Sequence, residues 1–379
     1  MTRSLRRGRA VAAAVVLTVC LASPVLVAAQ THPDQPPPTP PSADYPSLRL
    51  SGFGNIDFAV QDKSEGPRGF SEGQFVLHLA SALSPRVNFF GELSFTPRPD
   101  AGTGSPPATG FNAEVERAII RFDQSDRLKV SFGRYHTPIN WWNTAFHHGA
   151  WLQTTISRPE MTQFGGRFLP VHFVGGLLEG SVPAGGLHLN YQGGIGNGRG
   201  NVISRGGDAG DNNARPAYVL NAFVKPDQAF GLQVGGSFYL DRISQPGLPE
   251  VGEQIWAAHA VWQREDPELI AEIADVRHRV IGGTTTSSNL AYYVQAAYRL
   301  PSVARLWKPY YRFEHVHTNA ADPVFDLAMN AVPNLDGSTI GVRFDMSTYA
   351  AIKSEVRLRR RVEDEPRTNG WFLQICFTF

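Results

Sequence analysis

The stretch GWFLQICFTF at residues 370–379 alternates between two sets of side chains. In an extended strand, successive side chains point to opposite faces. One face would carry the apolar residues Trp371, Leu373, Ile375, Phe377 and Phe379. The other face would carry Phe372, Gln374, Cys376 and Thr378. Because termini fray, an aromatic end exposed to water is an aggregation hazard. The stretch therefore predicts a strand whose apolar face meets an apolar surrounding.

The same alternation recurs from Leu48 to the end of the chain. It is clear in LRLSGFGNIDF (48–58), QFVLHLA (74–80), RVNFFGELSFT (86–96) and GLQVGGSFYL (231–240). Counting every such segment predicts about sixteen strands, each with one apolar and one polar face. After residue 46, no stretch approaches the roughly 18 consecutive apolar residues of a membrane helix. A membrane location would therefore require strands.

The gaps between these segments alternate in length. Short connections such as LSPR (83–86), DQSD (123–126) and MSTY (346–349) are followed by long polar ones at 98–112, 134–166, 197–217 and 318–337. This layout is typical of outer-membrane proteins, in which closure of the sheet pairs every backbone group. We expect an all-β, transmembrane antiparallel β-barrel with short periplasmic turns and long extracellular loops. A soluble β-sandwich is the alternative, and it would not sort its loops in this way.

The N-terminal segment predicts export. Residues 1–29 combine a basic start, an apolar run and small residues before Gln30, which indicates a cleaved signal peptide rather than a membrane anchor. Residues 30–46 are rich in proline and predict a periplasmic linker, leaving 47–379 for the barrel. Removing the four arginines of the signal turns the formal charge of +1 slightly negative, which argues against nucleic-acid binding. Only Cys376 then remains, so an intrachain disulfide is excluded.

If the apolar faces meet lipid, the polar faces line the barrel interior. Bases outnumber acids at these positions. The candidate pore-lining residues are Arg117, Arg121, Arg127, Lys129, Arg299, Arg312, Arg343 and Arg357, with Arg49, Lys353, Arg359 and Arg361 in the same register. The acids in register are Asp57, Glu92, Asp123, Glu314, Asp345 and Glu355. A sixteen-strand barrel can hold an aqueous channel, so this lining predicts passage of small, preferably anionic, solutes. The alternative is that these charges pair across strands or bind lipid head groups.

The third long gap, at about 134–165, is unusually aromatic for an outer loop. It contains His136, Trp141, Trp142, His147, His148 and Trp151. So many aromatic side chains favour burial, and the available site is the barrel interior. We expect this loop to fold inward and constrict the lumen. A tryptophan-rich plug that closes the barrel is the alternative.

The stretches ERAIIRFDQSDRLKVSFGR (116–134) and SFGRYHTPINWWNTAFHHGAWLQTTISRPE (131–160), with the closing aromatic strand, resemble the superfamily of phosphate-selective porins O and P. The resemblance covers about 48–379, with specific motifs at 115–165. It implies an outer-membrane porin in which arginines line an anion path. Lysines cluster near the constriction of the phosphate-selective members, whereas this loop has none. Phe379 resembles the terminal signal read by the barrel-assembly machinery. Lipid and lipopolysaccharide are expected neighbours. A homotrimer is one candidate for the oligomeric state, which the sequence does not determine.

Metal binding and enzyme activity are two further functions that these residues could suggest. His136, His147 and His148, with Glu160 as a fourth ligand, suggest a metal site, but adjacent histidines in an irregular loop lack the spacing of known sites. We therefore expect neither a metal nor a cofactor. A membrane-embedded enzyme would need a nucleophile with a base and an acid. Although His78 and several serines are present, nothing marks such a group, and no enzyme activity is expected.

Overall fold

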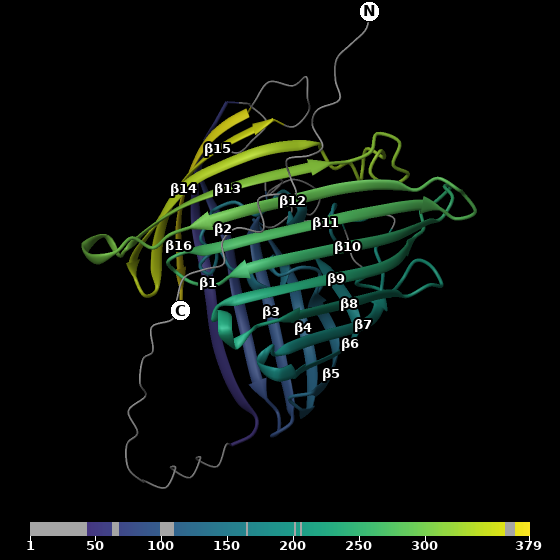
Figure 1. Cartoon of the computed structure of the whole chain (residues 1–379), viewed down its shortest axis with the longest axis horizontal. Coiled ribbons are helices and arrows are strands. Elements are labelled where there is room, and N and C mark those ends of the chain that lie inside the picture. The colour runs from purple at the N-terminus through teal and green to yellow at the C-terminus, as the bar shows by residue number, and fades with distance from the viewer. Residues whose placement is uncertain are drawn as a thin grey trace, which may run out of the picture. The chain divides into compact units, whose positions relative to one another are not determined.

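The computed structural model describes residues 44–62, 68–98, 110–163, 166–200, 202–204, 207–360 and 368–379. Within residues 44–379, sixteen strands pair antiparallel with their neighbours in chain order, and the last strand pairs with the first to close a barrel (Figure 1). This confirms the predicted fold class. The signal peptide expected at 1–29 and most of the linker expected at 30–46 lie outside the described residues.

The strands are β1 (Ser47–Gln61), β2 (Gly69–Ala82), β3 (Val87–Pro97), β4 (Phe111–Ser125), β5 (Leu128–His136), β6 (His172–Val182), β7 (Leu189–Asn197), β8 (Ala217–Val224), β9 (Leu232–Ile243), β10 (Val251–Trp262), β11 (Glu268–Val280), β12 (Ser287–Ala297), β13 (Trp307–His317), β14 (Leu335–Ser347), β15 (Ala350–Arg360) and β16 (Thr368–Thr378). The helices are α1 (Trp142–Phe146), η1 (Glu160–Thr162), η2 (Ala184–Gly186), η3 (Asp227–Ala229) and η4 (Ser302–Ala304). No helix in the described part of the chain is long and apolar enough to span a membrane.

The residues that alternate in the sequence lie alternately on the outer and the inner face of the barrel wall. In β16, Trp371 and Ile375 are exposed on the outer face, whereas Gln374 and Cys376 are buried on the inner face. β10 follows the same rule, with Glu253 buried and Trp256 exposed. An apolar outer face and a polar inner face are the expected pattern for a barrel surrounded by lipid.

The predicted alternation of loop lengths holds in the first half of the barrel and weakens in the second. Connections at one end include 126–127 and 348–349, and those at the other include 137–171 and 198–216. However, β9 and β10 are joined at the long-loop end by residues 244–250, whereas β12 and β13 are joined at the short-turn end by residues 298–306. Loop length alone therefore overstated the asymmetry.

Phe379 takes part in the seam between β1 and β16. Gly52 and Phe379 exchange two backbone hydrogen bonds, at 3.0 and 3.1 Å. The ring of Phe379 stacks on Phe75 of β2, with centroids 5.8 Å apart. A Cβ built on Gly52 would lie 2.5 Å from the Phe379 ring and 2.7 Å from the carbonyl oxygen of Val76. The glycine thus leaves room for the terminal ring across the seam.

We expect Gly52→Ala to impair closure of the barrel. The Val76 carbonyl belongs to the backbone of β2 and cannot swing away, so the added methyl should cost about 1–3 kcal/mol of overpacking. The measurement is the fraction of folded protein, read from heat-modifiable gel mobility. Gly110→Ala is the matched control, because a Cβ there meets nothing within 4 Å. Equal folded fractions for the two variants would contradict this account of the seam.

The interior is apolar along part of the wall, which the sequence analysis did not anticipate. Inward residues of β8 to β13, among them Val219, Tyr239, Ile255 and Val276, are buried in one cluster with residues of the third loop. The loop contributes Ile139, Trp141, Trp142, Met161, Phe168 and Leu169 to this cluster. One side of the barrel is therefore filled by packed side chains, in which this apolar cluster lies among buried polar residues such as Glu253, Glu272 and His278.

Candidate functional site

The third loop, residues 137–171, leaves β5 and is tied to the wall formed by β9 and β11. The backbone N–H groups of Trp141 and Trp142 both donate to Oε1 of Glu272, at 2.6 and 2.8 Å. The N–H of Asn140 donates to Oγ of Ser237 at 3.0 Å. Glu272 thereby caps the start of the short helix α1, where backbone donors have no partner within the helix.

A second set of anchors comes from β13, β14 and β15. Arg312 donates to the backbone oxygens of Ser157 and Arg158, at 2.8 and 3.1 Å. Nζ of Lys353 donates to three loop carbonyls, those of Ala150, Gln153 and Thr155. Because buried carbonyls need partners, these cations satisfy an irregular backbone inside the barrel.

Further contacts complete this attachment. Arg343 donates to the carbonyl of Trp151 at 2.7 Å, and Oε2 of Glu355 accepts from the N–H of Ile156 at 2.9 Å. The loop therefore contacts strands on several sides of the lumen rather than extending outward. Of the residues predicted for it, His136 is the last residue of β5 and belongs to the wall.

The tryptophans of the loop differ in their surroundings. Trp141 and Trp142 are buried in the cluster shared with β8 to β13, and the guanidinium of Arg158 lies 4.8 Å from the centre of a Trp142 ring. Trp151 is half-buried, with the guanidinium of Arg343 4.8 Å from its ring centre. The first two rings fix the loop by burial, and the third does so through a cation–π contact.

Most predicted pore-lining bases are paired with acids on the same wall. The closest nitrogen–oxygen distances are 2.5 Å for Arg117 and Glu92, 2.7 Å for Arg121 and Asp123, 2.7 Å for Arg343 and Asp345, and 2.5 Å for Arg357 and Glu355. Arg359 lies 3.1 Å from Glu314 and 3.3 Å from Glu160, and Arg312 lies 3.7 Å from Glu314. Most of these pairs join residues two apart on one strand, and Arg117–Glu92 joins β4 to β3. Ion pairing within and between strands therefore neutralises much of the basic excess that the sequence indicated.

Two predicted pore-lining residues were placed on the wall wrongly. β5 begins at Leu128, so Arg127 lies exposed in the two-residue turn before it. Arg299 is the second residue beyond the end of β12 and pairs with Glu265 and Asp345 at the short-turn end. Although burial opposes ionisation there, Lys308 and Arg299 hold the pKa of Glu265 below its ordinary value. Arg361 lies outside the described residues.

Arg49 and Lys129 are the predicted inward bases whose charge is not offset by an acidic partner among the described residues. Neither makes an ion pair within the ranges that the structure describes. Arg49 lines a cavity of about 490 Å³ at the short-turn end, together with Asn88, Arg117 and Arg121. We call this space the inner cavity.

Two more cavities continue along the same side of the interior. The middle cavity, of about 290 Å³, lies between the loop and strands β15, β16, β1 and β2, and Asp57, Gln74 and Arg357 line it. The outer cavity, of about 850 Å³, lies toward the long-loop end and is lined by Glu114, Glu116, Arg134, Asp208 and others. Gln74 and His148 line both. Polar space thus follows β15, β16 and β1 to β6.

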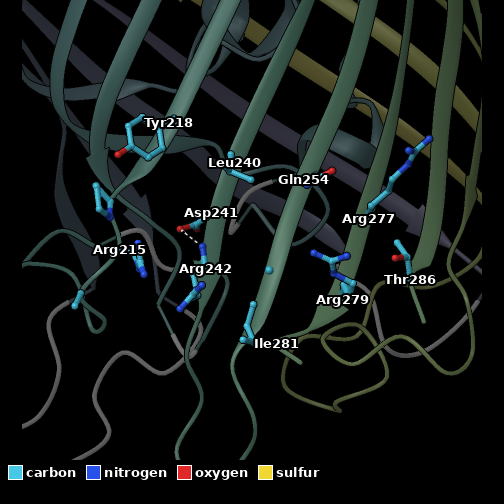
Figure 2. A pocket seen from close by; sticks show the side chains of 13 residues that line it. Arg215, Tyr218, Leu240, Asp241, Arg242, Gln254, Arg277, Arg279, Ile281 and Thr286 are labelled. Atoms are coloured by element: carbon cyan, nitrogen blue, oxygen red, sulfur yellow. Dashed lines mark hydrogen bonds between the residues drawn. The ribbon is translucent and has the colours of Figure 1, made fainter. Parts of the chain in front are cut away.

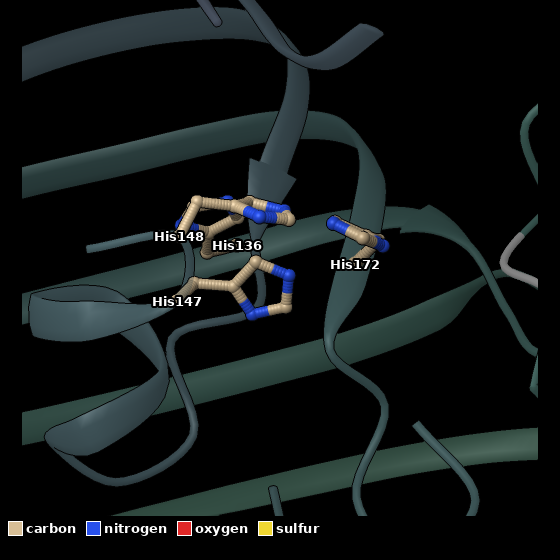
Figure 3. A group of neighbouring side chains, drawn as sticks. All are labelled: His136, His147, His148 and His172. Atoms are coloured by element: carbon tan, nitrogen blue, oxygen red, sulfur yellow. The ribbon is translucent and has the colours of Figure 1, made fainter. Parts of the chain in front are cut away.

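Four histidines meet where the loop approaches β5 and β6. His136 and His172 are paired residues of the two strands, and His147 and His148 follow α1 directly. One ring nitrogen of each lies within 4.8 Å of the others, and Figure 3 shows the rings gathered around a common centre. Burial and the nearby His136 and Arg158 hold the pKa of His147 well below its ordinary value.

Carboxylates border this cluster. Oε2 of Glu116 lies 2.9 Å from Nε2 of His172 and 3.1 Å from Nε2 of His148. Oε2 of Glu92 lies 3.4 Å from Nε2 of His136. Glu160, the acid that the sequence suggested as a fourth ligand, is instead bound to Arg359. That suggestion was wrong, because the loop carries Glu160 to the opposite wall.

Sequence reasoning missed three residues of this region for physical reasons. The register of β3 and β4 shifts beside Glu116, and this bulge turns Glu116 inward against the strand parity. His172 is distant from His136 in sequence and lies beside it through the pairing of β5 with β6. Glu272 alternates correctly with its neighbours, but nothing in the sequence links it to Trp141.

A separate cavity, of about 420 Å³, lies on the outer face of β8 to β12 at the long-loop end. Figure 2 shows Arg215, Arg242, Arg277 and Arg279 around it, beside the apolar side chains of Leu240 and Ile281. The arrangement combines positive charge with apolar surface on the side of the wall that faces away from the lumen.

No family model matches the sequence, and no curated protein matches it. Solved structures do. An anion-selective porin from Comamonas acidovorans aligns with a TM-score of 0.60 at 14% identity, covering 88% of this chain and 100% of that one. The channel DcaP of Acinetobacter baumannii gives 0.58 at 11%, covering 88% and 97%. OmpT of Vibrio cholerae gives 0.57 at 11%, covering 89% and 99%. At these identities the likeness shows the fold, that of outer-membrane β-barrels.

Proposed function

We propose that this chain is an outer-membrane porin, a water-filled channel for small hydrophilic solutes, narrowed by its third loop. The observation that carries the proposal is the row of polar cavities along β15, β16 and β1 to β6, beside a loop that is fixed to the opposite wall. A loop held in this way narrows a lumen without needing to fill it. An anion-selective porin and an outer-membrane channel that share the fold support the same interpretation.

Access to the passage is tested by labelling single cysteines. In a Cys376→Ser background, Gln74→Cys should react with a small, charged methanethiosulfonate reagent, because Gln74 lines both the middle and the outer cavity. Modification should lower single-channel conductance to about half or less, since the site is narrow. Val219→Cys is the control, as this position is buried in the apolar cluster and should not react. Reaction at Val219→Cys and none at Gln74→Cys would mean that the passage lies along β8 rather than along β15, β16 and β1 to β6, and would contradict the proposal.

The proposed preference for anions rests on the inner cavity. Arg49, Arg117 and Arg121 line it, whereas the outer cavity carries Glu114, Glu116 and Asp208 against Arg134. A solute would pass both cavities in turn, one with a net positive lining and the other with a net negative lining. We therefore propose a modest anion preference, set at the inner cavity, where Arg49 makes no ion pair with the described residues, and no specificity for phosphate.

Arg49→Gln with Arg121→Gln should shift the reversal potential toward cations. Loss of two positive charges from the inner cavity is expected to lower the chloride-to-potassium permeability ratio by about twofold or more at low salt, where screening is weak. Arg117 is left in place because its partner Glu92 is buried. Arg127→Gln, in the exposed turn, is the control and should change nothing. A wild-type pore that already prefers potassium would exclude the anion preference.

The remaining partners follow from this function. We propose that residues 1–29 direct export, that residues 30–46 form a periplasmic linker and that Phe379 is read during barrel assembly. The arginines of the outer-face cavity suit the phosphates of lipopolysaccharide, with Leu240 and Ile281 beside acyl chains. A homotrimer is proposed as the assembly, as one related OmpT structure is described as a trimer form.

A further inference from the structure

The four histidines form a set of donors that the proposed channel does not need. They come from three places in the chain, namely the end of β5, the start of β6 and the loop after α1. His136, His147 and His148 are almost fully buried, and His172 is mostly buried. Neither ring nitrogen of His136 makes a hydrogen bond of good geometry within the described residues, although Oε2 of Glu92 lies 3.4 Å from its Nε2. A buried imidazole in that state is costly unless something else occupies its lone pair.

The surroundings orient at least one ring for binding. The side-chain N–H groups of Asn143 donate to the carbonyls of Thr137 and Val171, both at 3.0 Å. Its Oδ1 therefore faces Nδ1 of His147 at 2.8 Å and can accept that ring's N–H. This leaves Nε2 of His147 as the lone-pair nitrogen, which is the usual second-layer arrangement around a metal-binding histidine. A guanidinium nitrogen of Arg158 also lies 3.0 Å from Nδ1 of His147. However, both side-chain N–H groups of Asn143 are already bonded to carbonyls, so its amide cannot turn and its oxygen stays directed at Nδ1.

We propose that His136, His147, His148 and His172 bind one divalent transition-metal ion of the Zn²⁺, Ni²⁺ or Cu²⁺ class. Imidazole nitrogen is a preferred ligand of these ions, and Mg²⁺ and Ca²⁺ prefer oxygen. A tetrahedral zinc ion at 2.0–2.1 Å from each nitrogen needs nitrogens about 3.4 Å apart. The present spread of up to 4.8 Å closes to that value if the rings rotate toward their centre.

The charge around the four histidines and the cavities that reach them also favour binding of a divalent cation. Glu116 and Glu92 bring two negative charges to the edge of the cluster, which offset Arg158 and the incoming cation. His148 and His172 line the outer cavity, and His147 and His148 line the middle cavity, so an ion can arrive through either space. Bound there, it would cross-link β5 and β6 to the third loop. The proposal does not depend on conduction.

The test is isothermal titration of the full, tag-free chain in detergent with Zn²⁺, after treatment with a chelator. We expect one zinc ion per chain with micromolar or tighter affinity, and no heat with Mg²⁺. His136→Ala and His172→Ala should each weaken zinc binding at least tenfold. His188→Ala is the matched control, because His188 is exposed in the β6–β7 turn and pairs with Asp227.

A second measurement guards against misfolding. Zinc should raise the temperature of the heat-modifiable transition in the wild type and in His188→Ala, and should not raise it in the conservative variant His172→Asn. Absence of zinc binding by the folded wild type would overturn the proposal. Binding that persists unchanged in folded His136→Ala and His172→Ala would overturn it equally, because the ion would then lie elsewhere.

Discussion

Replacing Trp141 and Trp142 with alanine is expected to raise single-channel conductance at least about twofold. Both side chains are buried in the cluster that joins the loop to β8 to β13. Truncating a buried tryptophan costs about 3–5 kcal/mol, and most of that loss falls on the attachment of the loop. The backbone contacts to Glu272 would then hold α1 without the support of packing. A mobile loop leaves more of the lumen open to ions.

Trp256→Ala is the matched control for this prediction. Trp256 is half exposed on the outer face of β10, at a relative accessibility of 50%, and it does not contact the loop cluster. The control should conduct like the wild type. If the double variant folds and still conducts like the control, the loop does not narrow the passage and the proposed constriction is wrong.

Replacing Lys353 with methionine is expected to have the second largest effect. Its ammonium group is completely buried and supplies donors to three loop carbonyls, and methionine fills a similar volume without any donor. Leaving buried carbonyls without partners should cost about 2–4 kcal/mol in total. We expect a lower temperature for the heat-modifiable transition and frequent brief changes of conductance, because residues 150–155 lose their attachment to β15.

Lys129→Met separates this effect from the loss of a positive charge. Lys129 lies on β5 and makes no contact with residues 150–155 within the described chain. Its replacement should leave the thermal transition and the current traces unchanged, apart from a small shift in selectivity. Identical behaviour of the two lysine variants would mean that charge, rather than attachment of the loop, determines the effect of Lys353.

The barrel could be predicted from the sequence because each strand carries its own evidence. In β16 the alternation of Trp371, Gln374 and Ile375 is local, and the structure places these residues on the expected faces. The same parity identified Arg312, Arg343 and Arg357 as inward. It failed for Arg127, because a strand that begins one residue later leaves that side chain in a turn.

The interior was harder to predict because it depends on contacts between distant residues. In β9, Tyr239 faces inward between the outward residues Phe238 and Leu240. Because all three side chains are largely apolar, the sequence does not show which of them faces the lumen. The apolar cluster inside the barrel was therefore not predicted. The acids that pair with the wall bases were visible, but only the three-dimensional register shows that Glu355 serves both Arg357 and the backbone of Ile156.

Single-channel recording of the purified protein in a planar bilayer tests the central claim most directly. The account predicts discrete, stable conductance steps from the wild type, with a modest preference for anions, because polar cavities run beside the third loop. Protein that is shown to be folded by its heat-modifiable mobility, and that inserts without any conductance step, would contradict the account and identify the loop as a plug.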